Sequence, residues 1–185
     1  MSNAVTALNA DAIRQALDLL NRKLADRQVT AELCVFGGAV MALVFDARES
    51  TRDVDAIMVP KSQLAEAALE VSSQLGLPHT WLNDGVKGFV SLHGDYTEAG
   101  MPQFEHLRIM RPTAEYLLAM KCLAARSDVF DDAPDRQDAL VLARHLGLTT
   151  EAEMLDIVSR FYPDSQLQAK TRYFVAELAQ ELTAN

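Results

Sequence analysis

The stretch that decides the fold is FGGAVMALVFDARESTRDVDAI, residues 36–57. It follows a short strand-like run, residues 31–36, and starts with two glycines that lead into an apolar segment suited to a short buried helix. A polar turn then leads into residues 53–59, which alternate in character. Because successive side chains of a strand point to opposite faces, Asp53 and Asp55 are expected to share one face.

Each part of this stretch has its own chemistry. Two carboxylates at alternate positions of a strand emerge close together and repel each other unless a cation lies between them. Mg²⁺ is the hard cation that accepts one or two carboxylates together with substrate phosphates. Two glycines at the start of a helix leave backbone N–H groups open to close approach by a phosphate. Taken alone, however, an Asp-x-Asp pair is also typical of a solvated strand edge.

The sequence around this stretch predicts an α+β half followed by a helical half. Apolar spacing predicts a helix over residues 11–25, capped by Asn9 or Asp11. Ser62 is expected to cap a second helix, which ends at Gly76. Residues 77–100 predict loops with one or two short strands, and a last strand is expected over residues 104–110. The remaining helices are expected over residues 115–126, 135–146, 150–161 and 164–182.

The composition describes an acidic globular chain. Its 185 residues and 49% hydrophobic content are enough for a packed core. The formal net charge of −9 argues against strong non-specific binding to nucleic acid, which depends on Lys and Arg neutralising phosphates. No membrane-spanning segment or secretion signal is evident, and Cys34 and Cys122 are expected to be separate buried thiols. A cytoplasmic protein without membrane partners is therefore expected.

The order of motifs in residues 36–57 resembles the signature of the DNA polymerase β-like nucleotidyltransferase superfamily: Gly-Gly, a helix, then Arg, Ser or Thr, and Asp-x-Asp. Further segments are similar to a family of small bacterial nucleotidyltransferase-fold proteins. That family is related in pattern to the abortive-infection and type IV toxin–antitoxin nucleotidyltransferases. The resemblance extends over about residues 33–174. The segments that carry it are WLNDGVKGF (81–89), EYLLAMKCLAAR (115–126) and DRQDALVLARHLG (135–147).

The resemblance implies a particular division of the chain. Residues 1–112 would form a minimal nucleotidyltransferase core, which is a mixed sheet with flanking helices. Residues 113–185 would form a C-terminal helical bundle packed on that core. The sequence contains no internal repeats or low-complexity tracts that would suggest another arrangement.

The same resemblance implies transfer of a nucleoside monophosphate from an NTP to an RNA 3′ end or a protein hydroxyl, with release of pyrophosphate. Two Mg²⁺ ions between Asp53 and Asp55 would serve the acceptor hydroxyl and the triphosphate. Catalytic members usually add a third carboxylate from a later strand, and Glu105 is the candidate here. A cognate antitoxin protein is an implied partner. The residues assigned to the nucleotide are Gly37, Gly38, Arg48, Thr51 and Lys121.

Two interpretations stay open for the basic and acidic residues of the helical half. Lys121 is either a surface lysine above an apolar helix face or a contact of the triphosphate. Arg126, Asp135 and Asp138 either form a buried ion network that joins two helices or belong to the nucleotide site.

The segment at residues 81–84 also has more than one interpretation. Trp81 is expected to be a packing anchor rather than a platform for a base, whereas Asn83 and Asp84 form either a turn or a part of the site. For the whole chain, the alternative to a transferase is a catalytically inactive nucleotide-binding or protein-interaction module on the same fold.

Overall fold

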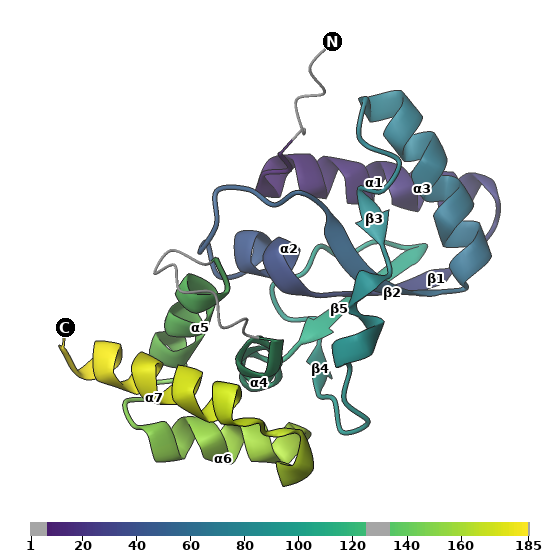
Figure 1. Ribbon diagram of the computed structural model, residues 1–185. Helices are drawn as coiled ribbons and strands as arrows, with labels where there is room; N and C mark the ends of the chain where they lie inside the picture. Colours follow the sequence, from purple (N-terminus) through teal and green to yellow (C-terminus); the bar gives the residue numbers. More distant parts are fainter. Residues whose placement is uncertain (1–6, 125–133, 185) are drawn as a thin grey trace. The chain divides into compact units, whose positions relative to one another are not determined.

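The computed structural model describes residues 7–124 and 134–184. Within these ranges the protein is α+β, with a five-stranded mixed sheet and seven α-helices (Figure 1). The chain folds into two compact units. The first comprises the residues up to Lys87 together with Thr97–Arg111, and the second comprises Gly88–Tyr96 together with the chain from Pro112 onward. The loop Gly88–Tyr96 thus groups with the helical half although it precedes the last long strand of the sheet.

The sheet has the strand order β3-β2-β1-β5-β4 (Figure 1). Strand β1 pairs antiparallel with β2 and parallel with β5, and β2 pairs parallel with β3. The two long neighbours of β1 therefore run in opposite directions, which makes the sheet mixed. The strands are β1 (Ala31–Val35), β2 (Val54–Val59), β3 (Leu82–Asn83), β4 (Tyr96–Thr97) and β5 (Leu107–Pro112).

Helix α1 (Ala10–Asp26) follows the apolar spacing seen in the sequence. Asn9 is its cap, because the Asn9 side-chain oxygen accepts from the backbone N–H of Ala12 at 2.8 Å. The predicted cap at Asn9 is thus confirmed, and the apolar stripe of α1 is buried inside the first unit. The buried side chains of α1 include Ile13, Leu17, Leu20 and Leu24.

Helices α2 (Gly37–Leu43) and α3 (Lys61–Leu75) follow β1 and β2 directly. The expectation that Ser62 caps α3 is wrong, since the N-cap is Pro60, two residues earlier, and it makes no side-chain hydrogen bond. A proline can take this place because its backbone angle suits the entry to a helix. The predicted stop at Gly76 is confirmed, because Gly76 has a φ of 68°.

Trp81 is completely buried in the first unit. Its indole N–H donates to the backbone carbonyl of Ala68 in α3 at 3.0 Å, which satisfies the one polar atom of the ring. The backbone carbonyl of Trp81 in turn accepts from the N–H of Val54 at 2.6 Å. Trp81 is therefore a packing anchor, as predicted, and it fixes the entry into β3 beside the start of β2.

The second unit is built around helix α4 (Ala114–Ala124), which contacts all three later helices. Those helices are α5 (Pro134–His145), α6 (Glu151–Phe161) and α7 (Ala169–Ala184). Thr150 starts α6 with a capping box that includes Glu153. Helix α7 begins later than expected because residues Asp164–Gln166 form a separate short 3₁₀ turn, η2.

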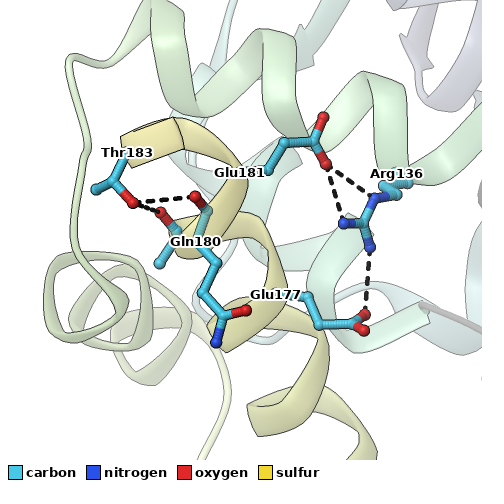
Figure 2. A network of polar contacts seen from close by, with 6 residues as sticks. Arg136, Glu177, Gln180, Glu181 and Thr183 are labelled. Carbon is cyan, nitrogen blue, oxygen red and sulfur yellow. Dashed lines mark hydrogen bonds and ion pairs between the residues drawn. The ribbon is translucent and has the colours of Figure 1, made fainter. Parts of the chain in front are cut away.

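Arg136 of α5 joins that helix to α7 (Figure 2). Its guanidinium donates to Glu181 at 2.9 and 3.2 Å and to Glu177 at 3.2 Å. The Arg136 side chain is only 18% exposed, so these two carboxylates compensate a largely buried charge. The two glutamates lie one turn apart on α7, and one arginine can therefore bind both.

The loop Gly88–Tyr96 is held on the second unit by backbone and side-chain contacts. The backbone N–H of Ser91 donates to the hydroxyl of Tyr116 at 2.7 Å, and that of Thr113 donates to the carbonyl of Asp95 at 3.0 Å. A Cβ on Gly94 would come within 2.8 Å of the Tyr116 ring, so a glycine is needed for this close approach. The sequence, which shows only an aperiodic stretch here, did not reveal this packing.

Cys34 and Cys122 are both free and buried, as predicted. Burial raises the pKa of each thiol to about 12. Within residues 7–124 and 134–184, none of the helices combines the length and apolar content that crossing a membrane requires.

Candidate functional site

The Asp53 and Asp55 carboxylates lie where β2 begins. Val54, Ala56 and Met58 are buried, whereas the two aspartates are half-buried, so the predicted alternation of faces is confirmed. The backbone N–H of Phe36 donates to the carbonyl of Asp55 at 2.9 Å. The two carboxylates therefore lie beside the point at which β1 ends and α2 starts.

Gly37 brings the backbone of this junction against Asp55. Its φ of 60° is in the left-handed region, which a residue with a side chain adopts only under strain. A Cβ placed on Gly37 would lie 3.5 Å from Oδ2 of Asp55. The glycine therefore allows the sharp turn out of β1 and leaves one side of the Asp55 carboxylate without a neighbouring side chain from position 37.

Gly38 lies against the turn that precedes β2. A Cβ on Gly38 would come within 2.7 Å of the Thr51 hydroxyl oxygen and 3.1 Å of a guanidinium nitrogen of Arg48. Such distances leave no room for a side chain, so Gly38, Arg48 and Thr51 are packed in direct contact. The backbone of Thr51 is fixed in turn by a pair of hydrogen bonds with Leu8, at 2.7 and 2.9 Å.

Asn83 completes the surroundings of the carboxylates. In the parallel β2–β3 register, Asn83 pairs with Asp55, and its amide nitrogen donates to Oδ2 of Asp53 at 3.1 Å. The oxygen of the same amide accepts from the backbone N–H of Gly85 at 2.8 Å. The adjacent Asp84 instead forms an ion pair with Lys61 at 2.5 Å. Of the two residues left open by the sequence, Asn83 thus contacts the aspartate pair directly through a hydrogen bond.

Gly85 lies on the other side of Asp55. A Cβ on Gly85 would be 3.4 Å from Oδ1 of Asp55 and 3.0 Å from the side-chain oxygen of Asn83. The Asp55 carboxylate thus has a glycine near each of its oxygens, Gly37 near Oδ2 and Gly85 near Oδ1. The sequence signal for Gly85 was present in the segment 81–89, but no spacing rule linked that glycine to Asp55.

Glu105 lies at the other end of the sheet. The parallel register pairs Leu107 with Ala31 at the start of β1, whereas Ala56 pairs with Val35 at its end. Because β5 runs parallel to β1, an exposed residue that precedes β5 is separated from Asp55 by the length of β1, roughly 13 Å at about 3.3 Å per residue. The structure therefore does not bring Glu105 to Asp53 and Asp55.

The residue of β5 nearest in register to the aspartate end of β1 is basic. Cys34 pairs with Met110, so Arg111 follows at the level where β1 ends. Arg111 is buried, donates through Nε to the carbonyl of Ala99 at 2.8 Å, and has its guanidinium 5.3 Å from the ring centre of Phe45. Burial lowers the pKa of Arg111. No carboxylate on β5 takes this position.

Lys121 belongs to the second unit and is not a surface lysine. Its side chain is 10% exposed, and its Nζ lies 2.7 Å from a carboxylate oxygen of Asp135 and 2.7 Å from one of Asp138. Asp138 is 1% exposed, so a buried ion network joins α4 to α5. Arg126, the other cation considered for this network, lies outside the described residues. The assignment of Lys121 to a nucleotide stays a prediction.

The described part of the chain holds no group of three or more His, Cys, Asp or Glu side chains that could bind a metal ion. A cation at Asp53 and Asp55 would accordingly need further oxygen ligands from a bound molecule or from water. Comparisons of this chain with protein-family models, with curated proteins and with solved structures found no match.

Proposed function

We propose that this protein is a nucleotidyltransferase that binds an NTP with Mg²⁺ at Asp53 and Asp55. The observation that carries the proposal is the convergence, in one unit of the structure, of two carboxylates and a close-packed, glycine-rich turn with its own arginine. These parts are separated in sequence by the whole of α2 and a polar turn. The residues concerned are Gly37, Gly38, Arg48, Thr51, Asp53, Asp55, Asn83 and Gly85.

The donor set fits a hard divalent cation. Asp53 and Asp55 offer only oxygen ligands. Because both lie on one face of β2, their carboxylates repel each other, and a bound cation would reduce that repulsion. Positions 37 and 85, which lie near the two oxygens of Asp55, are glycines and place no side chain against that carboxylate. When bound, Mg²⁺ would neutralise phosphate charge and lower the pKa of an acceptor hydroxyl.

The protein groups would bind the nucleotide through its phosphates. Gly37 and Gly38 offer backbone without side chains, which lets a phosphate approach the main chain closely. Helix α2 has only 7 residues, so its dipole adds little to this binding. Arg48, packed against Gly38, adds a positive charge on the same side, and the Thr51 hydroxyl adds a hydrogen-bonding group.

The proposed reaction moves a nucleoside monophosphate from the NTP to an acceptor hydroxyl, and pyrophosphate leaves. An RNA 3′ end and a protein hydroxyl are the two acceptor classes. The net charge of −9 makes non-specific attraction of RNA weak, so an RNA acceptor would have to be recognised by a few local contacts. The resemblance in motif order further supports a role as the toxin of a toxin–antitoxin pair, with an antitoxin protein as partner.

A second candidate function is nucleotide binding without transfer. It is favoured by the uncharged Asn83, which lies opposite Asp55 on the neighbouring strand, and by the distance of Glu105 from the pair. With two carboxylates in the described residues around the site, the protein has fewer negative groups to hold metal ions than a three-carboxylate centre has.

Transfer of label separates the two candidates. The full-length protein is incubated with Mg²⁺ and each α-³²P-labelled NTP, together with total bacterial RNA or total bacterial protein. Under the transferase proposal, label enters one acceptor fraction, and an Asp53→Asn/Asp55→Asn variant transfers none. Binding of the NTP without transfer to either fraction supports the second candidate. Equal transfer by the protein and the variant would contradict both.

A further inference from the structure

We propose that Asn83 is a positioning residue, which holds the Asp53 carboxylate in the orientation in which that carboxylate binds the Mg²⁺ of the nucleotide complex. The inference rests on the proposed nucleotide site and adds to it a residue that lies outside the acidic motif. It follows from three features of the first unit: the direction of the Asn83 amide, the fixed place of β3, and the position of Asp53 at the start of β2.

Asn83 faces Asp53 with its amide nitrogen. The backbone N–H of Gly85 lies 2.8 Å from the other end of the amide, which must therefore be the oxygen. The NH₂ group then donates to Oδ2 of Asp53 at 3.1 Å. A flipped amide would place two donors together at Gly85 and two acceptors together at Asp53. Because an NH₂ group has no lone pair to offer a cation, this end of Asn83 acts on a metal through Asp53.

The backbone of Asn83 is itself fixed. In the parallel β2–β3 register, Asn83 pairs with Asp55. One residue before β3, the carbonyl of Trp81 accepts from the N–H of Val54 at 2.6 Å, and the buried indole donates to the carbonyl of Ala68 at 3.0 Å. The short strand is thus held by both β2 and α3. The Asn83 amide therefore has a defined place from which it can restrain the side chain that it contacts.

Asp53 is a side chain on which such a restraint has an effect. It precedes Val54, the first residue of β2, and it is half-buried, so it keeps more rotational freedom than a buried side chain does. A hydrogen bond to a charged group is stronger than one between neutral groups, and it limits the rotation of the carboxylate. Order that is already present in the free protein does not have to be created when a ligand binds. Asn83 is therefore expected to increase the affinity of Asp53 for a cation.

One substitution can separate the two hydrogen bonds of Asn83. The bond to Gly85 joins residues two apart in sequence and fixes the local turn, a role that the hydroxyl of a serine can also fill. A serine side chain ends before the atom that donates to Asp53. Asn83→Ser therefore keeps an acceptor for the turn, adds no charge and removes the donor. Asn83→Thr makes the same change with a branched side chain that suits a strand, and it replaces the serine variant if that variant does not fold.

Calorimetric titration of each NTP, in Mg²⁺ and in EDTA, tests the inference on the full-length protein. In Asn83→Ser we expect the affinity in Mg²⁺ to fall about tenfold, the effect of losing one hydrogen bond to a charged group. The affinity in EDTA and the free energy of unfolding in urea should equal those of the natural chain, because the turn is retained. A residue with a structural role alone would instead weaken binding in both conditions and lower the free energy of unfolding.

Asn9→Ser is the matched control. Asn9 also accepts from a backbone N–H through its side-chain oxygen, at 2.8 Å from Ala12, and serine is an equally good helix cap. The substitution is thus the same, in the same unit, with the same kind of backbone contact. This variant should equal the natural chain in all three measurements.

The outcomes separate the inference from the proposed function. The inference is overturned if Asn83→Ser keeps the natural affinity in Mg²⁺, or if it loses equal affinity in Mg²⁺ and in EDTA. Where EDTA abolishes binding to the natural chain as well, an unchanged free energy of unfolding beside the loss in Mg²⁺ supports the inference, and a lowered one overturns it. Failure of every NTP to bind the natural chain in Mg²⁺ would instead overturn the proposed function, and this inference with it.

Discussion

The amide nitrogen of Asn83 lies 3.1 Å from Oδ2 of Asp53, although the two residues are 30 positions apart in sequence. The contact exists because β3 pairs in parallel with β2 and puts Asn83 opposite Asp55. A neutral side chain therefore lies in contact with one of the two carboxylates. The surroundings of the two carboxylates thus include an amide donor that their own sequence motif does not reveal.

Substitution of Gly38 by alanine is expected to weaken nucleotide binding. The new Cβ would lie 2.7 Å from the Thr51 hydroxyl and 3.1 Å from the Arg48 guanidinium, so one of these side chains must move. Overpacking of this kind costs about 1–3 kcal/mol of stability. Affinity for Mg²⁺·NTP and the free energy of unfolding can be measured on the same preparation. Gly88→Ala is the control, because a Cβ there meets nothing within 4 Å, and it should change neither quantity.

The secondary structure was largely predictable, whereas the register of the sheet was not. The helix over residues 10–26 and the strand that carries Asp55 follow from local periodicity, which depends on residues close in sequence. The start of α3 was misjudged because Ser62 is a common capping residue, yet Pro60 took the cap. The capping preference of a residue type alone could not show at which residue the helix would begin.

The placement of Glu105 and Asn83 depends on strand pairing that no local pattern reveals. A carboxylate near a predicted strand was a reasonable candidate, but the parallel β1–β5 register puts it at the far end of β1. Asn83 lies in a strand of two residues, too short to show alternation. By contrast, Gly37, Gly38, Arg48 and Thr51 were selected as one motif, and the structure gathers them around the start of α2 and β2.

Removal of Lys121 is expected to destabilise the second unit strongly. In Lys121→Met the carboxylate of Asp138, 1% exposed, loses its cation partner at 2.7 Å. Loss of one partner of a buried ion pair costs roughly 3–5 kcal/mol. Urea denaturation measures the change. The double variant Lys121→Met/Asp138→Leu should recover part of the loss, because it removes the buried carboxylate as well.

Arg22→Met is the control for that prediction. Arg22 pairs with Asp18 on the exposed face of α1, with 68% and 42% of the two side chains accessible. An exposed pair contributes about 0–1 kcal/mol, so this variant should be close to the natural protein in stability. A loss in Lys121→Met no larger than in Arg22→Met would contradict the buried network.

The two cysteines are expected to make stability fall at high pH. Burial raises the pKa of the Cys34 and Cys122 thiols from 9.0 to about 12. The folded chain thus keeps these protons where the unfolded chain has lost them. The contribution of the thiols to the free energy of unfolding is complete below pH 9.0 and is lost as the pH rises towards about 12.

Denaturation curves of the natural chain and of Cys34→Ala/Cys122→Ala, recorded across this pH range, test the point. The natural chain should lose stability more steeply, by up to about 1.4 kcal/mol per pH unit for each thiol. Parallel curves would show that the thiols ionise equally in both states.

Expression in bacteria tests the proposed role as a toxin. If transfer to RNA or protein is toxic, induction of the natural chain should arrest growth, and Asp53→Asn/Asp55→Asn should not. Protein levels must be matched by immunoblot, because loss of expression would imitate loss of toxicity. Equal arrest by both chains would exclude toxicity by transfer.

Calorimetric titration of each of the four NTPs with Mg²⁺ tests the central claim most directly. The natural chain, Asp53→Asn/Asp55→Asn and Glu105→Gln are compared, since Glu105 is a carboxylate at the other end of the sheet. We expect one NTP to bind the natural chain and Glu105→Gln equally, and to lose its Mg²⁺-dependent binding in the aspartate variant. Binding that survives in the aspartate variant, or that no NTP shows with the natural chain, would contradict a nucleotide site at Asp53 and Asp55.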